Sequence, residues 1–206
     1  MLDEGRHWFT GGVLESILTA MALVLAVVQP VPQVLRVVRG GRIAGVSGPT
    51  TWLGFALNAG WLAYGAAQGL LPLLVLSAVY AAGYGTIGIL LVSRGNRSGI
   101  VPAVVVAAFG ALLVVAVGWT ALGTVLALAV GLQFLPQVVE AWRGTDLSGL
   151  APGTYVVGAV DGVVWGGYGL VVGDVPLVLY GVIMCTVAGL VLLPVRRWNR
   201  VAAAVA

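Results

Sequence analysis

The chain has few charged residues, no lysine and almost no cysteine. Charged side chains make up 8% of its 206 residues, whereas hydrophobic ones make up 60%. Soluble domains carry charge on about a quarter of their residues, so this composition excludes a soluble domain of useful size. The single cysteine, Cys185, excludes an internal disulfide and a metal site built from several thiolates. Because the sequence has no cofactor motif or catalytic constellation either, we expect no cofactor, no metal and no enzymatic activity.

Long apolar runs are what the chain has instead. Its mean hydropathy is +1.07, and about 20 apolar residues suffice to cross a hydrocarbon core of about 30 Å. Runs of that kind predict seven transmembrane helices, at 14–37, 48–68, 71–93, 101–118, 121–142, 152–172 and 175–195. The predicted fold class is therefore an all-α, multi-pass membrane protein with the lipid bilayer as its main partner.

The ten basic residues are all arginine, and nine of them lie at or beyond the C-terminal ends of the first, third, fifth and seventh runs. The nine are Arg36, Arg39, Arg42, Arg94, Arg97, Arg143, Arg196, Arg197 and Arg200. Cytoplasmic loops carry the excess of basic residues, which predicts an outside N-terminus and a cytoplasmic tail at 196–206. This placement accounts for the net charge of +3 without a nucleic-acid partner. Arginine without lysine, with abundant alanine, valine and glycine, is typical of GC-rich bacterial genomes and favours a bacterial inner membrane.

The sequence repeats itself without gaps when it is shifted by 104 residues. The shift superimposes residues that are too rare in this chain to match by chance: Gln29 on Gln133, Pro32 on Pro136, Gln33 on Gln137, Arg39 on Arg143, Trp61 on Trp165, Tyr64 on Tyr168 and Pro72 on Pro176. The repeat predicts a three-helix unit at 14–93, a linker with the fourth helix at 94–118, and a second unit at 119–195. Each unit has three helices, an odd number, so one helix between them gives both units the same orientation in the membrane. Transporters built from parallel repeats have this arrangement. Transport by alternating access is favoured over a purely structural bundle.

Polar residues inside the runs are costly in lipid and therefore mark candidate function. Asp161 lies ten residues into the sixth run, and Asn58 lies at a similar depth in the second. Trp61 follows Asn58 by three residues, and Trp165 follows Asp161 by four. These spacings place each tryptophan on the same helical face as its polar neighbour. We expect the four side chains to line a solute pocket, with Asp161 as a possible proton site. Core packing of the tryptophans and a buried hydrogen bond of Asp161 are the alternatives.

Proline lies inside the first and fifth runs, beside glutamine. Pro32-Gln33 and Pro136-Gln137 follow Gln29 and Gln133 by three residues. A proline within a helix removes a backbone hydrogen bond and kinks it. The pattern predicts a kink in each unit, which is either a hinge or a static bend.

The Pro-Gln pair, followed by tryptophan and by Tyr-Gly in both halves, resembles the PQ-loop superfamily. The 3-1-3 layout is similar to that of the SWEET sugar transporters, whose half-size bacterial relatives are the SemiSWEETs. The second half is the more similar, through Phe134-Leu135-Pro136-Gln137, Trp165, Tyr168-Gly169 and Asp174-Val175-Pro176. The resemblance implies movement of a small sugar through a central pocket between the two repeats.

The resemblance also implies roles for particular residues. The pocket tryptophan of the family matches Trp61 and Trp165, and its hinge prolines match Pro32, Pro49, Pro136 and Pro152, with Gln33 and Gln137 adjoining. The family's sugar-binding asparagine is replaced by Ser77 and Gly181, and Asn58, one helix away, is a candidate to compensate.

Asp161 departs from the sugar carriers and is similar to an acidic residue of cystinosin-like exporters, although about one turn later. A proton-coupled transporter of an amino acid or another small polar solute is therefore the alternative function. A ligand receptor on the same fold ranks last, since no basic residue lies deep in a run. The sequence leaves the solute and a possible homo-oligomer open.

Overall fold

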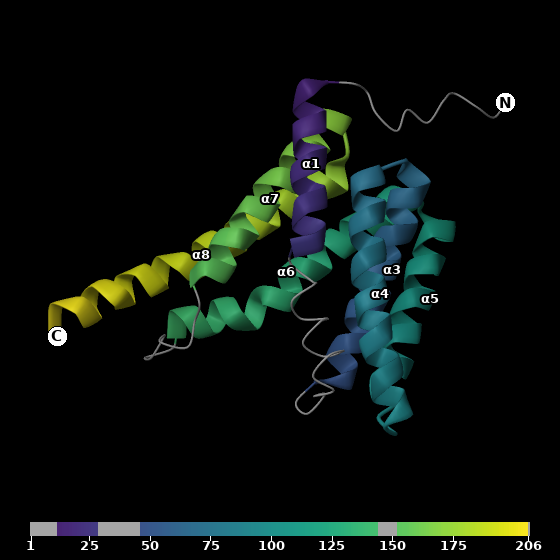
Figure 1. Ribbon diagram of the computed structural model, residues 1–206, viewed down its shortest axis with the longest axis horizontal. Helices are drawn as coiled ribbons and strands as arrows, with labels where there is room; N and C mark the ends of the chain where they lie inside the picture. Colours follow the sequence, from purple (N-terminus) through teal and green to yellow (C-terminus); the bar gives the residue numbers. More distant parts are fainter. Residues whose placement is uncertain (1–11, 29–45, 144–151, 206) are drawn as a thin grey trace. The chain divides into compact units, whose positions relative to one another are not determined.

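The computed structural model describes residues 12–28, 46–143 and 152–205 (Figure 1). Regular structure in these ranges is entirely helical, which confirms the all-α prediction. The seven helices described are α1 (Val13–Val28), α3 (Gly48–Gln68), α4 (Leu71–Ser93), α5 (Ile100–Ala116), α6 (Trp119–Arg143), α7 (Pro152–Val172) and α8 (Val175–Val205). The bounds of α3, α4 and α7 coincide with the predicted runs.

Four of these helices are long and apolar enough to cross a membrane: α4, α6, α7 and the Val175–Val195 part of α8. The apolar helices α1 and α5 have 16 and 17 residues, somewhat fewer than the roughly 20 needed to span the hydrocarbon core. The predicted run 14–37 continues past α1 into residues outside the description. At the other end, the candidate span Val175–Val195 has the predicted bounds, and α8 continues beyond it as helix to Val205.

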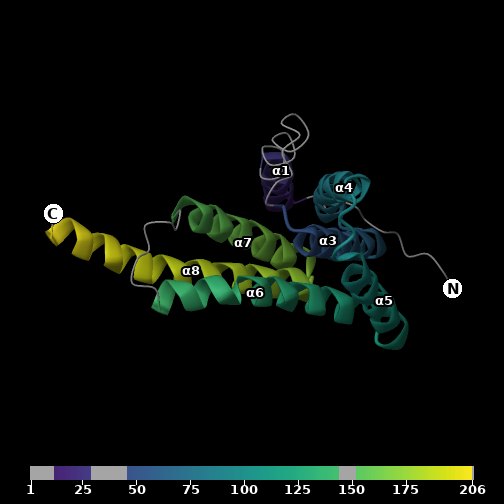
Figure 2. The same cartoon turned by 90° about the horizontal axis from the view of Figure 1, so that it is seen from below.

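Contacts divide the chain into two compact units, Met1–Leu126 and Ala127–Ala206. In the first unit α4 packs against both α1 and α3, and α5, the predicted linker helix, packs against α3. In the second unit α8 packs against α7 and runs beside α6 (Figure 2). The indole Nε1 of Trp142 on α6 donates a hydrogen bond to the Leu190 carbonyl on α8, at 2.8 Å. The third helix of each predicted repeat thus contacts the other two.

The same turn joins α3 to α4 and α7 to α8. Gly69 and Gly173 end the first helix of each pair with φ of 72°, a left-handed conformation that favours glycine because it has no Cβ. The next amide donates back to Gly65 O in one turn and to Gly169 O in the other, at 2.8 Å in both. This hydrogen bond from the second residue beyond the helix is the Schellman arrangement. The 104-residue shift therefore superimposes backbone geometry at these turns as well as sequence.

Candidate functional site

A tryptophan and a tyrosine pack against each other on α3, and an equivalent pair packs on α7. The rings of Trp61 and Tyr64 lie 5.8 Å apart at 81°, and those of Trp165 and Tyr168 lie 6.1 Å apart at 87°. Both are edge-to-face contacts, which aromatic quadrupoles favour. Trp61 is 8% exposed and Trp165 is 1% exposed, and both tyrosines are buried. The tryptophans predicted to lie inside the spans are thus buried side chains in the structure.

Glycine beside each aromatic pair lets the next helix come close. A Cβ added to Gly65 would lie 3.1 Å from the Leu74 amide nitrogen, and one added to Gly169 would lie 2.7 Å from that of Val178. The Tyr-Gly sequence therefore has a physical reason in both units: tyrosine fills the interior, while glycine admits the neighbouring backbone.

Asp161 has a hydrogen-bonding partner that sequence reasoning missed. The Tyr180 hydroxyl on α8 donates to Asp161 Oδ2 on α7 at 2.6 Å. Asp161 is 7% exposed, and an ionised carboxylate buried in an apolar helix pair requires such a partner. The two residues lie 19 positions apart, on different helices, so no local spacing connects them. A tyrosine inside the apolar run next to that of Asp161 was the available signal.

Gly181, predicted as a solute contact, lies at a close approach of α7 and α8. A Cβ on Gly181 would lie 2.5 Å from the Gly162 carbonyl oxygen and 2.5 Å from Gly166 Cα. The two backbones meet directly here, in the glycine-mediated manner common between membrane helices. Asp161 and Tyr180 immediately precede Gly162 and Gly181, so their hydrogen bond lies beside this contact.

The first unit has a different set of polar groups. The Asn58 amide nitrogen donates to Gly54 O of its own helix at 2.8 Å, and Ser77 is buried on α4. The shift by 104 residues places Leu57 and Leu76 on Asp161 and Tyr180. The carboxylate and its phenol partner therefore belong to the second unit, and the equivalent positions of the first unit are apolar.

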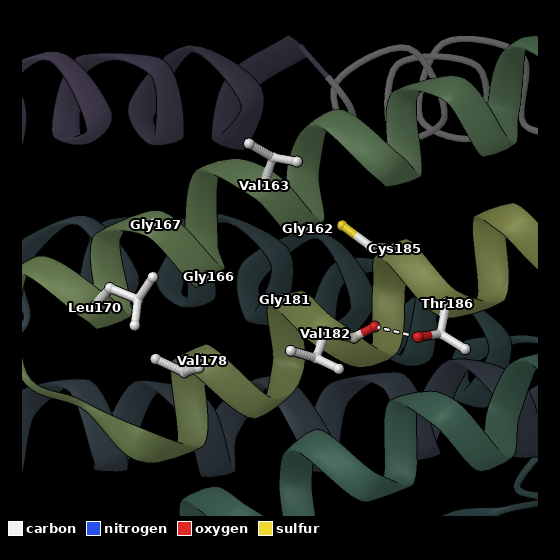
Figure 3. Close-up of a pocket in the computed structure, with 10 residues that line it drawn as sticks. All are labelled: Gly162, Val163, Gly166, Gly167, Leu170, Val178, Gly181, Val182, Cys185 and Thr186. Carbon is white, nitrogen blue, oxygen red and sulfur yellow. Dashed lines mark hydrogen bonds between the residues drawn. The ribbon is translucent and has the colours of Figure 1, made fainter.

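A shallow groove of about 350 Å³ runs along α7 and α8 (Figure 3). Its walls include Val163 and Leu170 on α7 and Val178 and Val182 on α8, over a glycine floor. Its one hydroxyl, that of Thr186, donates to Val182 O at 2.7 Å. Of the predicted site residues only Gly181 lines this groove, and neither Asp161 nor Trp165 does. The groove is apolar and differs from the predicted solute pocket.

The predicted hinge prolines occupy two kinds of position. Pro49 lies in the first turn of α3 and Pro152 is the first residue of α7, where proline is favoured because its missing N–H has no helical partner. Pro136 lies inside α6, which continues as helix on both sides of it, with Gln137 half-buried. Pro32 and Gln33 lie outside the described residues. Motion at these prolines stays a prediction.

Among the residues that the structure describes, no group of three histidine, cysteine or acidic side chains is placed to hold a metal ion. No protein-family model matches the sequence, and no curated protein matches it. The resemblance to the PQ-loop superfamily therefore rests on the repeated sequence motifs alone.

Proposed function

We propose that the chain is a SWEET-like PQ-loop transporter that moves a small sugar by alternating access through a pocket between two three-helix repeats. In this proposal the linker helix separates the repeats, the N-terminus lies outside and the C-terminus lies in the cytoplasm of a bacterial cell. The observation that carries it is the repeated helical hairpin, with the same turn and the same Trp–Tyr pair in α3–α4 and α7–α8. Two equivalent halves are what an alternating-access carrier requires.

The aromatic pairs support sugar as the solute. The flat face of a tryptophan packs against the apolar C–H face of a sugar ring, and nearby polar groups fix its orientation. Because Trp61 and Trp165 are buried, they can contact a solute only in a state in which their surroundings open. We therefore expect the tryptophans to become accessible during the transport cycle.

A second candidate function is favoured by Asp161. A carboxylate buried within a membrane helix and hydrogen-bonded to a tyrosine is typical of proton-relay positions in transporters. In this alternative the chain carries an amino acid or another small polar solute together with a proton. The two candidates differ in one measurable property, the response of uptake to a proton gradient.

The experiment is uptake of radiolabelled sugars and amino acids into proteoliposomes that contain the full chain. It is run with and without an inward proton gradient. Equilibrating sugar uptake that ignores the gradient supports the sugar uniporter. Accumulation of a solute driven by the gradient in the wild type, and absent in Asp161→Asn, supports the proton-coupled alternative. Uptake no faster than in protein-free vesicles, for every solute in the panel, contradicts both.

A further inference from the structure

We propose that the Tyr180 hydroxyl is hydrogen-bonded to the Asp161 carboxylate in the empty carrier, and that a hydroxyl of the solute displaces the tyrosine when the solute binds. This inference rests on the proposed function, because it names the polar contact of the solute site. It assigns to Tyr180 a role as a competitor for the carboxylate, which neither the repeat nor the motifs predict.

The hydrogen bond has the geometry that a bound solute would also adopt. Tyr180 Oη lies 2.6 Å from Asp161 Oδ2, within the 2.5–2.7 Å range typical of a hydroxyl donating to a carboxylate. A phenol and a sugar hydroxyl each offer one O–H donor to such an acceptor. The tyrosine, a residue of the chain itself, therefore makes the same hydrogen bond to Asp161 that a hydroxyl of a bound polyol would make.

The hairpin itself does not require this pair. The α3–α4 hairpin has the same turn and the same aromatic contact, yet it carries Leu57 and Leu76 at the equivalent positions. A Tyr–Asp bond is thus unnecessary for the architecture of the repeat. Its presence in α7–α8 alone points to a role specific to the second unit.

The backbone beside the pair is closely packed, whereas the phenol ring is partly exposed. Gly162 and Gly181 pack backbone against backbone directly after Asp161 and Tyr180. Tyr180 itself is only half-buried, while Asp161 is 7% exposed. Rotation of the Tyr180 side chain would therefore open Asp161 Oδ2 to a solute without separating the helices. An exchange of one hydroxyl for another replaces the hydrogen bond at that oxygen, which avoids the cost of breaking it without a substitute.

Tyr180→Phe tests the proposal, because it keeps the ring and removes only the competing hydroxyl. Binding of radiolabelled glucose to the purified full chain is the measurement. We expect Tyr180→Phe to bind glucose roughly three- to tenfold more tightly, since one hydrogen bond to the carboxyl oxygen no longer competes. The matched control is Tyr155→Phe, which removes a phenol hydroxyl six residues before Asp161 on α7 and should leave affinity unchanged. Asp161→Asn should weaken binding, and adding Tyr180→Phe to it should restore nothing. Weaker binding by Tyr180→Phe alone would overturn the proposal.

A second measurement separates this inference from the proposed function. Dicyclohexylcarbodiimide is an apolar reagent that modifies carboxyl groups within membranes, and mass spectrometry locates the adduct. Tyr180→Phe should speed modification of Asp161 severalfold, with Glu140 on α6 as the reference acid in the same chain. Unchanged modification of Asp161 would show that Tyr180 does not cover it and would overturn the inference. Faster modification in a chain that binds no sugar would support the role of Tyr180 and contradict sugar as the solute.

Discussion

The two helical hairpins α3–α4 and α7–α8 are alike at the turn and different away from it. Near the turn, both have the left-handed glycine, the buried proline and the glycine that admits the next helix. Farther along, α3 and α4 meet through aromatic rings over glycines: Tyr84 covers Gly54. In α7 and α8 the glycines face each other instead, and Gly181 meets Gly162 and Gly166.

The difference shows where the repeat is constrained and where it is free to diverge. The turn is specified by backbone geometry, so few residues satisfy it. Away from the turn, two helices can pack either with an aromatic ring of one against a glycine of the other, or with glycines of both in direct backbone contact. The second solution accompanies a Tyr–Asp pair in α7–α8, whereas the first hairpin stays apolar at those positions. The two hairpins thus share their architecture, and for the proposed carrier we expect solute selectivity to lie mainly in the second unit.

The largest expected effect concerns the tryptophans. Replacing a buried tryptophan by alanine costs about 3–5 kcal/mol, and Trp165 is more deeply buried than Trp61. We expect Trp165→Ala to destabilise the chain more than Trp61→Ala, measured as thermal unfolding in detergent. Equal losses would contradict the ranking by burial, and no loss in either variant would contradict a packing role for the tryptophans. A transport role is better tested with phenylalanine, which keeps most of the apolar volume.

Gly181→Ala should give the next largest effect. The new Cβ would meet backbone atoms of Gly162 and Gly166 at 2.5 Å, and such overpacking typically costs about 1–3 kcal/mol. The control is Gly189→Ala on the same helix, where an added Cβ meets nothing within 4 Å. Unfolding midpoints should fall for the first variant and stay level or rise for the second. A stable Gly181→Ala chain would contradict close backbone packing of α7 on α8.

The turn glycines should respond equally in both hairpins. Gly69→Ala and Gly173→Ala each force a Cβ into a left-handed conformation, at a cost of roughly 1–2 kcal/mol. Because φ is 72° at both, the two losses in unfolding free energy should agree within the precision of the measurement. A large effect at one turn only would break the equivalence of the hairpins.

The smallest effect on stability is expected for the prolines, and the quantity to measure for them is the rate of sugar exchange. Pro136→Ala restores a backbone donor inside α6 and should slow sugar exchange across proteoliposomes while leaving binding intact, because a hinge need not touch the solute. Pro152→Ala, at the first position of α7, is the comparison and should alter exchange less. Unchanged exchange in Pro136→Ala would mean that any bend in α6 is static.

Much of the helical framework was predictable from sequence because its determinants are local. The ends of α3, α4 and α7 follow from Gly69, Pro72 and Pro152 acting on their own neighbours. By contrast, the helical continuation of α8 to Val205 was missed, because the loss of hydrophobicity after residue 195 marks the end of a span and not of a helix.

The candidate site was predictable only in part. The intraspan tryptophans and Asp161 are identified by their residue types in an apolar run. Tyr180 could not be paired with Asp161, since the pairing depends on how two helices pack. Gly181 is predicted only as the replacement for the asparagine of the resembling family, and its close contact with Gly162 depends on an interhelical distance that the sequence does not state.

The most direct test of the account is counterflow of glucose in proteoliposomes. Vesicles loaded with unlabelled glucose accumulate labelled glucose transiently above its equilibrium level only if one site is exposed to each side of the membrane in turn. The account predicts transient accumulation of label by the wild type and by the control Trp119→Phe, whose ring is partly exposed at the start of α6. It predicts a large loss in the Trp61→Phe, Trp165→Phe double variant. Absence of accumulation in the wild type, or full counterflow in the double variant, would contradict a sugar carrier that uses both tryptophans.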